Sequence, residues 1–226
     1  TNCQTEEERK RTDELIRPIL RGRDIKRYGY VENGLFLINT HNGLRGKLPR
    51  IDINDYPAVK AHLDQYWDKI SVRSDKGDTP YNLRNCAYLE DFSRPKIIWK
   101  RIGSILRFSF DNKGCLGLDS TCFAAGEHIG YLCCVLNSLM GHYLLKDAPK
   151  TGTGDLLVSV QAIEPARIPY NAQYDRQLSS LLDIQLINSS NTTEKEINDI
   201  VFTMYGLSPN EREYVTQYVK LSQQSQ

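Results

Sequence analysis

The stretch PKIIWKRIGSILRFSFDNKG, residues 95–114, constrains the fold more than any other part of the chain. Leu106, Phe108 and Phe110 alternate with polar residues, which is typical of a strand with one apolar and one polar face. The apolar run IIW precedes them, the turn sequence DNKG follows, and CLGLDSTCFAA continues as a third β segment. Three short segments linked by turns predict a small, curved antiparallel β-sheet that is partly barrel-like.

Helical patterns flank this sheet on both sides in the sequence. Apolar residues recur at helical spacing, with Trp67 expected in the core, and the cap signals are those that start helices. The predicted helices cover residues 55–70, 129–146, 172–188, 193–206 and 208–222. The fold class that follows is α+β, with helices packed on the sheet.

Two further β features and a domain division are expected. Asn33-Gly34 lies between alternating residues of 30–40 and predicts a hairpin, and LLVSV, 156–160, predicts a short strand. We expect residues 1–14 to be a flexible or helical lead-in, 15–170 a β-rich recognition domain, and 171–226 a helical C-terminal subdomain.

Composition excludes several classes of protein. The 29 Lys and Arg residues balance 28 Asp and Glu residues, so the chain is not a wholly basic nucleic-acid coat. It has neither an apolar run of the roughly 20 residues that a membrane span needs nor a signal-peptide pattern at its start, and we expect no membrane partner and a cytoplasmic location. The six cysteines form no CxxC pair and the four histidines complete no zinc pattern, so no metal ligands are predicted.

No catalytic motif is present in the sequence. KTGTGD, residues 150–155, resembles a phosphate loop, but its Lys precedes the glycines and a strand rather than a helix is expected next. The [DNS]-P-P-[YF] motif of amino-methyltransferases is absent, and the histidines stand far apart. We therefore predict no catalytic residues and no cofactor for this chain.

Positive charge is nevertheless concentrated in a few segments. Arg and Lys side chains neutralise phosphates and read guanine edges, and glycine-rich loops hold phosphate oxygens. A solvated strand face or a plain connecting loop explains the same composition equally simply. The candidate DNA-binding residues are Lys96, Lys100, Arg101 and Arg107 on the predicted ribbon, Lys150, Thr151 and Thr153 in the loop, and Arg21, Arg23 and Lys26 in the segment RGRDIK, where Asp24 could instead tie up Arg21 or Arg27.

Several segments together resemble a known family. LIRPILRGRDIKRYGY, RFSFDNKG, DSTCFAAG, GTGDLLVSVQAIEPARIP and EINDIVFTMYGLSPNEREYV occur in the order seen in the TaqI-like C-terminal specificity domain, and the resemblance covers about residues 15–220. This domain is the target-recognition region of adenine-N6 DNA methyltransferases and of fused restriction-modification enzymes.

The resemblance implies a division of labour. In the family, an upstream domain of the same polypeptide binds S-adenosylmethionine, flips the target adenine and methylates it, and an endonuclease is fused in some members. The C-terminal domain supplies sequence recognition on double-stranded DNA. The chain is then expected to be the recognition part and not an enzyme by itself. The alternatives are a protein-interaction module that docks onto a catalytic partner and, less favoured, a stand-alone nuclease.

Overall fold

The computed structural model describes residues 3–224, and the chain forms two compact units. Neither unit is one continuous stretch of sequence. Unit 1 consists of Thr1–Ile19, Gly34–Ser93 and Gly114–Leu116, and unit 2 of Leu20–Asn33, Arg94–Lys113 and Gly117–Gln226. The division expected from the sequence, with boundaries at residues 15 and 171, stays a prediction, whereas these compact units divide at other positions.

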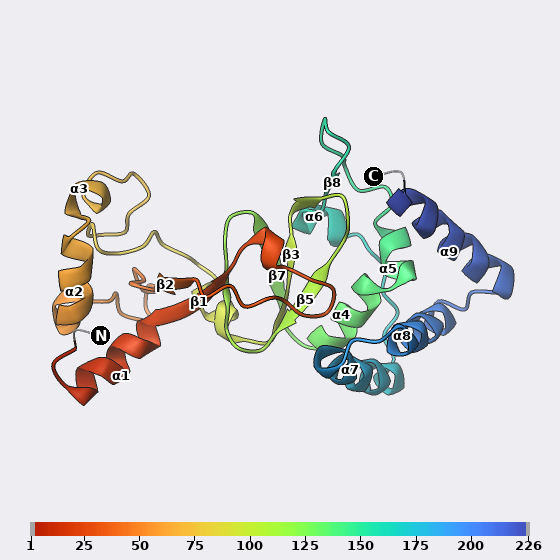
Figure 1. The fold of residues 1–226 in the computed structure, drawn as a ribbon, viewed down its shortest axis with the longest axis horizontal. Helices are drawn as coiled ribbons and strands as arrows, with labels where there is room; N and C mark the ends of the chain where they lie inside the picture. Colours follow the sequence, from red (N-terminus) through yellow and green to blue (C-terminus); the bar gives the residue numbers. More distant parts are fainter. Residues whose placement is uncertain (1–2, 225–226) are drawn as a thin grey trace. The chain divides into compact units, whose positions relative to one another are not determined.

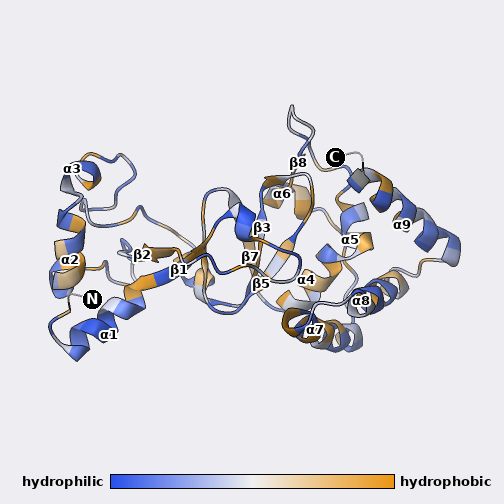
Figure 2. Cartoon of the chain, in the orientation of Figure 1, coloured by the Kyte–Doolittle hydropathy of each residue, from blue (hydrophilic) through white to orange (hydrophobic). Residues whose placement is uncertain are grey.

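Unit 1 begins with the helix α1 (Glu6–Leu15), which Thr5 caps by accepting a hydrogen bond from the backbone of Glu8 (3.1 Å). Most of α1 is hydrophilic, as Figure 2 shows, so apolar burial contributes little to its attachment. Instead the buried Glu8 carboxylate accepts a hydrogen bond from the backbone of Ala58 (2.9 Å), in the first turn of α2 (Pro57–Asp64). A charged side chain thus joins the two helices.

The helix predicted over 55–70 is interrupted in the structure. A 3-10 turn, η2 (Ile53–Asp55), precedes α2, and a separate short helix, α3 (Trp67–Ile70), follows it. Trp67 is 44% exposed, so the expectation that it belongs to the core is wrong. The second segment of unit 1 ends in the 3-10 helix η3 (Leu89–Ser93).

The strand β2 (Phe36–Ile38) pairs antiparallel with β1 (Ile16–Leu20), and Ile16 lies opposite Ile38. A third strand, β6 (Leu116–Gly117), completes the order β2-β1-β6. The hairpin predicted over 30–40 is therefore wrong. Gly34 does adopt the expected left-handed conformation (φ +67). However, the strand that follows it, β2, pairs with β1, and the loop between these two strands is far longer than a hairpin turn.

The sheet predicted from residues 95–125 is confirmed in unit 2. The central strand is β3 (Lys96–Lys100), and it pairs antiparallel with β5 (Phe108–Asp111) on one side and β7 (Thr121–Ala125) on the other. β4 (Ile102–Gly103) pairs antiparallel with β8 (Leu156–Leu157). The α+β class is confirmed, and among the described residues none of the small sheets closes into a barrel.

Helices of unit 2 pack against this sheet and against one another (Figure 1). The helix predicted over 129–146 is two helices, because Ser138 accepts a hydrogen bond from Gly141 and starts a new one (3.1 Å). The strand predicted at 156–160 ends at Leu157, and a short helix follows. The helices are α4 (Ile129–Asn137), α5 (Leu139–Leu144), α6 (Val160–Ile163), α7 (Ala172–Ile187), α8 (Asn191–Met204) and α9 (Pro209–Gln224).

The core of unit 2 lies between α4 and its neighbours. α4 packs against β3, β5 and α7, and its side chains Cys133, Cys134 and Val135 have no exposed surface. Burial raises the pKa of the Cys133 thiol to about 12, so this thiol is a packing group. None of the described helices has the length and apolar character needed to cross a membrane.

Cap signals placed the C-terminal helices well. Ser208 and Glu211 form the cap at the start of the helix predicted over 208–222, since both the backbone and the hydroxyl of Ser208 donate to the Glu211 carboxylate (2.8 and 2.7 Å). The cap of α8 lies three residues earlier than expected, because Ser190 accepts from the backbone of Thr193 (3.1 Å).

The buried pair of Lys96 and Asp111 gives a stability prediction. Both side chains are fully buried and ion-paired across β3 and β5, and Tyr30 also donates to Asp111 (2.9 Å). Lys96→Met leaves a buried carboxylate without its cation, so the free energy of unfolding should fall by about 3–5 kcal/mol in urea denaturation.

Two variants control this experiment. Lys113→Met removes a cation from the exposed pair with Glu32 and should change stability by less than about 1 kcal/mol. Lys96→Met combined with Asp111→Asn removes both buried charges and should recover part of the loss. A Lys96→Met protein as stable as Lys113→Met would contradict the structural role of the pair.

Candidate nucleic-acid interface

A small hollow of about 100 Å³ lies where the chain leaves β3 in unit 2. Its wall combines the end of β3, the loop that leads to β5, and the 3-10 helix η1 (Gly22–Asp24). The cations Lys100 and Arg107, both candidates from the sequence, lie on this wall and are exposed. The residues that line it are Gly22, Ile25, Lys100, Gly103, Ser104, Ile105 and Arg107.

Gly22 allows η1 to lie directly against Lys100. A Cβ atom at position 22 would stand 2.9 Å from Cγ of Lys100, closer than side chains tolerate. The aliphatic stem of Lys100 is therefore packed against backbone while the residue as a whole remains exposed. This packing fixes the base of a cationic side chain whose charged end stays available.

The backbone of Arg101 is held on both sides. Its N–H donates to the carbonyl of Ser120 (3.0 Å), and its carbonyl accepts from the N–H of Val158 (2.8 Å). The indole of Trp99 donates to the carbonyl of the same Val158 (2.7 Å) from within the core. The exposed Arg101 side chain thus projects from a rigid point, which limits the entropy lost when it binds.

The loop 150–155 is attached to the same part of unit 2. Gly103 lies opposite Leu156 in the β4–β8 pair, and Leu156 forms a bridge with Lys150. Lys150 is exposed. Inside the loop the hydroxyls of Thr151 and Thr153 lie 2.8 Å apart, and that of Thr153 donates to the Asp155 carboxylate (3.3 Å). The threonines are therefore engaged within the loop, and Lys150 is its available cation.

Arg21 is tied internally, as the sequence had left open. Its guanidinium forms two hydrogen bonds to the carboxylate of Asp24 (2.9 Å each), which is buried and also accepts from the amide of Asn33. Arg23 and Lys26 are exposed, and the Lys26 ammonium donates to the carbonyl of Arg23 (3.2 Å). The segment therefore offers Arg23 and Lys26 to a ligand, whereas Arg21 serves the local fold.

Lys96 requires a correction. It was predicted as a phosphate contact, but its side chain has no exposed surface and pairs with the buried Asp111. The alternation of the ribbon misled the prediction, because both faces of β3 are covered and Lys96, Ile97, Ile98 and Trp99 are all buried. A group without surface cannot meet a phosphate, so Lys96 belongs to the core.

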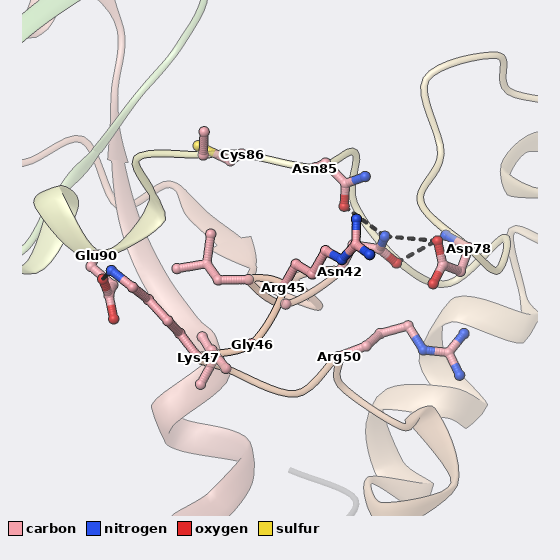
Figure 3. Close-up of a pocket in the computed structure, with 13 residues that line it drawn as sticks. Asn42, Arg45, Gly46, Lys47, Arg50, Asp78, Asn85, Cys86 and Glu90 are labelled. Carbon is pink, nitrogen blue, oxygen red and sulfur yellow. Dashed lines mark hydrogen bonds and ion pairs between the residues drawn. The ribbon is translucent and has the colours of Figure 1, made fainter.

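A basic loop in unit 1 escaped the sequence prediction. The segment GLRGKLPR, residues 43–50, carries Arg45, Lys47 and Arg50 and no acidic residue, and that run of charge is the signal that could have identified it. These three side chains are exposed and border a hollow of about 680 Å³ (Figure 3).

His128, Asp175 and Ser179 lie close together but do not form a Ser-His-Asp arrangement. His128 pairs with Asp175 through Nδ1 (2.6 Å), beside another hollow of unit 2. The nearby Ser179 hydroxyl donates to Asp175 (3.3 Å) rather than to the imidazole, so the base does not face this hydroxyl. Within residues 3–224, no group of His, Cys, Asp and Glu side chains is placed to hold a metal ion.

Comparison with known proteins shows the fold. The chain is similar to a solved structure described as the type IIL restriction-modification enzyme MmeI in complex with DNA. The TM-score is 0.59 at 13% sequence identity, and the match covers 98% of this chain and 33% of that chain. The chain therefore shares its fold with one part of a restriction-modification enzyme and spans about a third of its length. No protein-family model and no curated protein matches the sequence.

The Arg21–Asp24 pair predicts a pH dependence of stability. The Arg21 guanidinium holds the pKa of the Asp24 carboxyl well below its usual range, so the unfolded chain binds this proton more readily than the folded one. The stabilisation, about 2 kcal/mol, is present above pH ~4 and is lost as the pH falls below that value.

Asp24→Asn should therefore be less stable than the parent protein at neutral pH, and the difference should narrow in acid. Thermal unfolding between neutral and acidic pH measures it. Asp199→Asn, at an exposed site on α8, is the matched control and should follow the parent at every pH. A constant difference for Asp24→Asn would contradict the assigned role of the ion pair.

Proposed function

We propose that this chain recognises a short site in double-stranded DNA and positions it for a methyltransferase domain carried elsewhere in the same polypeptide. The observation that carries the proposal is the hollow of unit 2, where Lys100 and Arg107 meet on one wall. Arg101 and the loop 150–155 adjoin it through the ladder of β4 and β8. Two segments distant in sequence, residues 100–107 and the loop 150–155, thus present cations from one region.

The charged groups of Lys100, Arg101 and Arg107 are not used in polar contacts within the part of the fold that the structure describes. Lys100, Arg101 and Arg107 form no ion pair and no side-chain hydrogen bond within the described residues. A protein that neutralises phosphates needs such unpaired cations, since each one displaces a counterion from the DNA when it binds. Because the Arg101 backbone is fixed and the Lys100 stem is packed, the charges are held in place, which favours recognition over loose attraction.

The fold comparison supports the same function. The similar enzyme was solved with DNA, and it is a restriction-modification enzyme. Together with the order of sequence segments, this favours a specificity domain of the TaqI-like kind, from an adenine-N6 methyltransferase or a fused restriction-modification enzyme. In this proposal the chain binds no cofactor and is no enzyme by itself, and S-adenosylmethionine belongs to the catalytic domain of the parent polypeptide.

Recognition by a separate domain has a physical rationale. A base that is flipped out of a duplex loses its stacking and pairing, at a cost of a few kcal/mol. Contacts to phosphates and base edges beside the target offset this cost and set the register of the enzyme on its site. A rigid cationic wall is suited to that task, whereas the chemistry needs other residues.

A double substitution tests the proposal. Arg101→Ala with Arg107→Ala should weaken binding to duplex DNA, and the slope of log affinity against log salt should fall by about one for each lost phosphate contact. If one of the two reads a guanine edge, its removal should cost about 1–3 kcal/mol and relax the preference at one position. Fluorescence anisotropy over a range of salt concentrations measures both quantities.

The matched control is Arg167→Ala with Arg176→Ala, which removes two exposed arginines from other segments of unit 2. This protein should bind DNA as the parent does, and circular dichroism should show that both double variants are folded. Binding by the parent that is insensitive to salt, or unaffected by loss of Arg101 and Arg107, would overturn the proposal and favour a protein-interaction module.

A further inference from the structure

The basic loop of unit 1, residues 43–50, is separate from the interface proposed in unit 2. It contributes Arg45, Lys47 and Arg50 to the rim of the hollow of about 680 Å³. Neither the sequence prediction nor the comparisons assign a role to it. A hollow bordered by exposed cations on a single loop is nevertheless the kind of surface that binds an anion.

Contacts inside unit 1 hold this loop in one conformation. The Asn42 amide donates to the side chains of Asp78 (2.9 Å) and Asn85 (2.7 Å), which anchors the start of the loop. The backbones of Leu44 and Leu48 then exchange hydrogen bonds (2.8 and 2.9 Å) and close a tight turn. The loop is therefore a built element and not a flexible basic tail.

The backbone at Gly43 lies very close to the backbone of residues 48–50. Its φ of +78 lies in the left-handed region, and a Cβ atom there would stand 2.5 Å from the carbonyl oxygen of Leu48. Only glycine fits both requirements. Gly43 therefore allows the tight turn of this loop, in which Arg45, Lys47 and Arg50 are exposed.

The charges of the loop are largely unneutralised. Arg45 and Arg50 form no ion pair or hydrogen bond among the described residues. Lys47 lies 3.9 Å from the Glu90 carboxylate, but both side chains are well exposed, and such pairs contribute little. The carboxylate of Asp78 also lines the hollow and accepts the Asn42 amide, but no ion pair joins it to an arginine among the described residues.

The arrangement fits a polyanion better than a single small anion. In Figure 3 Lys47 extends toward Glu90, whereas Arg45, which ends beside Asn42 and Asn85, and Arg50 extend toward the opposite side of the view. A small anion needs convergent donors, whereas successive phosphates of a nucleic-acid backbone need cations spread along a surface.

We propose that the loop 43–50 is a second contact to duplex DNA, through Arg45, Lys47 and Arg50. The inference rests on the proposed function, since it takes the same duplex as ligand. It adds that unit 1 also takes part in DNA binding.

The test compares matched double variants of the whole chain on mixed-sequence duplex DNA. Arg45→Ala with Arg50→Ala should bind about tenfold more weakly at low salt, and the slope of log affinity against log salt should fall by about two. Arg9→Ala with Lys10→Ala removes two exposed cations from α1 of the same unit and should leave both quantities unchanged. Equal melting temperatures show that the variants are folded.

A gain of binding provides an independent measurement. Glu90→Gln removes the carboxylate beside Lys47 and should strengthen binding severalfold, with a steeper salt dependence. Unfolding of a variant cannot imitate this result. An Arg45/Arg50 variant that binds like the Arg9/Lys10 control, or a Glu90→Gln protein with unchanged affinity, would overturn the inference.

The outcomes separate this inference from the function on which it rests. If the parent protein shows no salt-dependent DNA binding, both fail. If loss of Arg101 and Arg107 weakens binding and loss of Arg45 and Arg50 does not, only the second contact fails. Competition by duplex RNA that exceeds competition by duplex DNA would also overturn it, because the loop would then serve a different nucleic acid.

Discussion

The candidate interface depends on how the outer edge of strand β5 is covered by another segment of unit 2. β5 is the outer strand of the order β5-β3-β7, and an uncovered edge would leave backbone groups unpaired. The segment that carries Tyr28 covers it, since the N–H of Tyr28 donates to Phe108 (2.9 Å) and its carbonyl accepts from Phe110 (2.6 Å). The amide of Asn137 adds bonds to both backbone groups of Phe108 (2.7 and 3.1 Å).

This closure positions the cationic wall. The hydroxyl of Ser109 donates to the carbonyl of Gly29 (2.6 Å), so the segment after η1 is fixed against the sheet. η1 is thereby held beside the end of β3, where Gly22 meets Lys100. The buried ion pair of Lys96 and Asp111 joins β3 and β5, in whose register the two residues lie opposite each other. Structure and binding surface therefore share one scaffold.

Local signals in the sequence predicted some parts of this structure and could not predict others. The start of α9 follows from Ser208 and Glu211, which lie three residues apart, and such a signal is complete in itself. The break at Ser138 was missed because the apolar pattern continues across it, and a single hydroxyl decides the matter. The burial of Lys96 depends on Asp111, its partner across the register, and the sequence alone does not fix that register.

The same distinction applies to the site. Alternation along residues 95–114 correctly brought Lys100 and Arg107 to one region, because they flank strands that pair. The alternation could not reveal that η1 lies beside Lys100, because that contact depends on the segment that covers the edge of β5. The two compact units alternate along the chain. Local sequence patterns do not show this alternation, and they predicted residues 15–170 as one domain. Long-range packing, and not propensity, decides such features.

The cations of this chain fall into two populations, and only one of them informs on function. Lys96, Arg21 and Arg27 meet Asp111, Asp24 and Glu194, and their charges are cancelled within the fold. The cations of the hollow and of the basic loop form no comparable pairs among the described residues, apart from the long contact of Lys47 with Glu90. A net charge of +1 conceals this difference, because exposed acids elsewhere balance the sum. A duplex responds to the local potential at its phosphates, which is screened within about 10 Å, and not to the total charge. The charge left after internal pairing is therefore the quantity that an interface hypothesis should use.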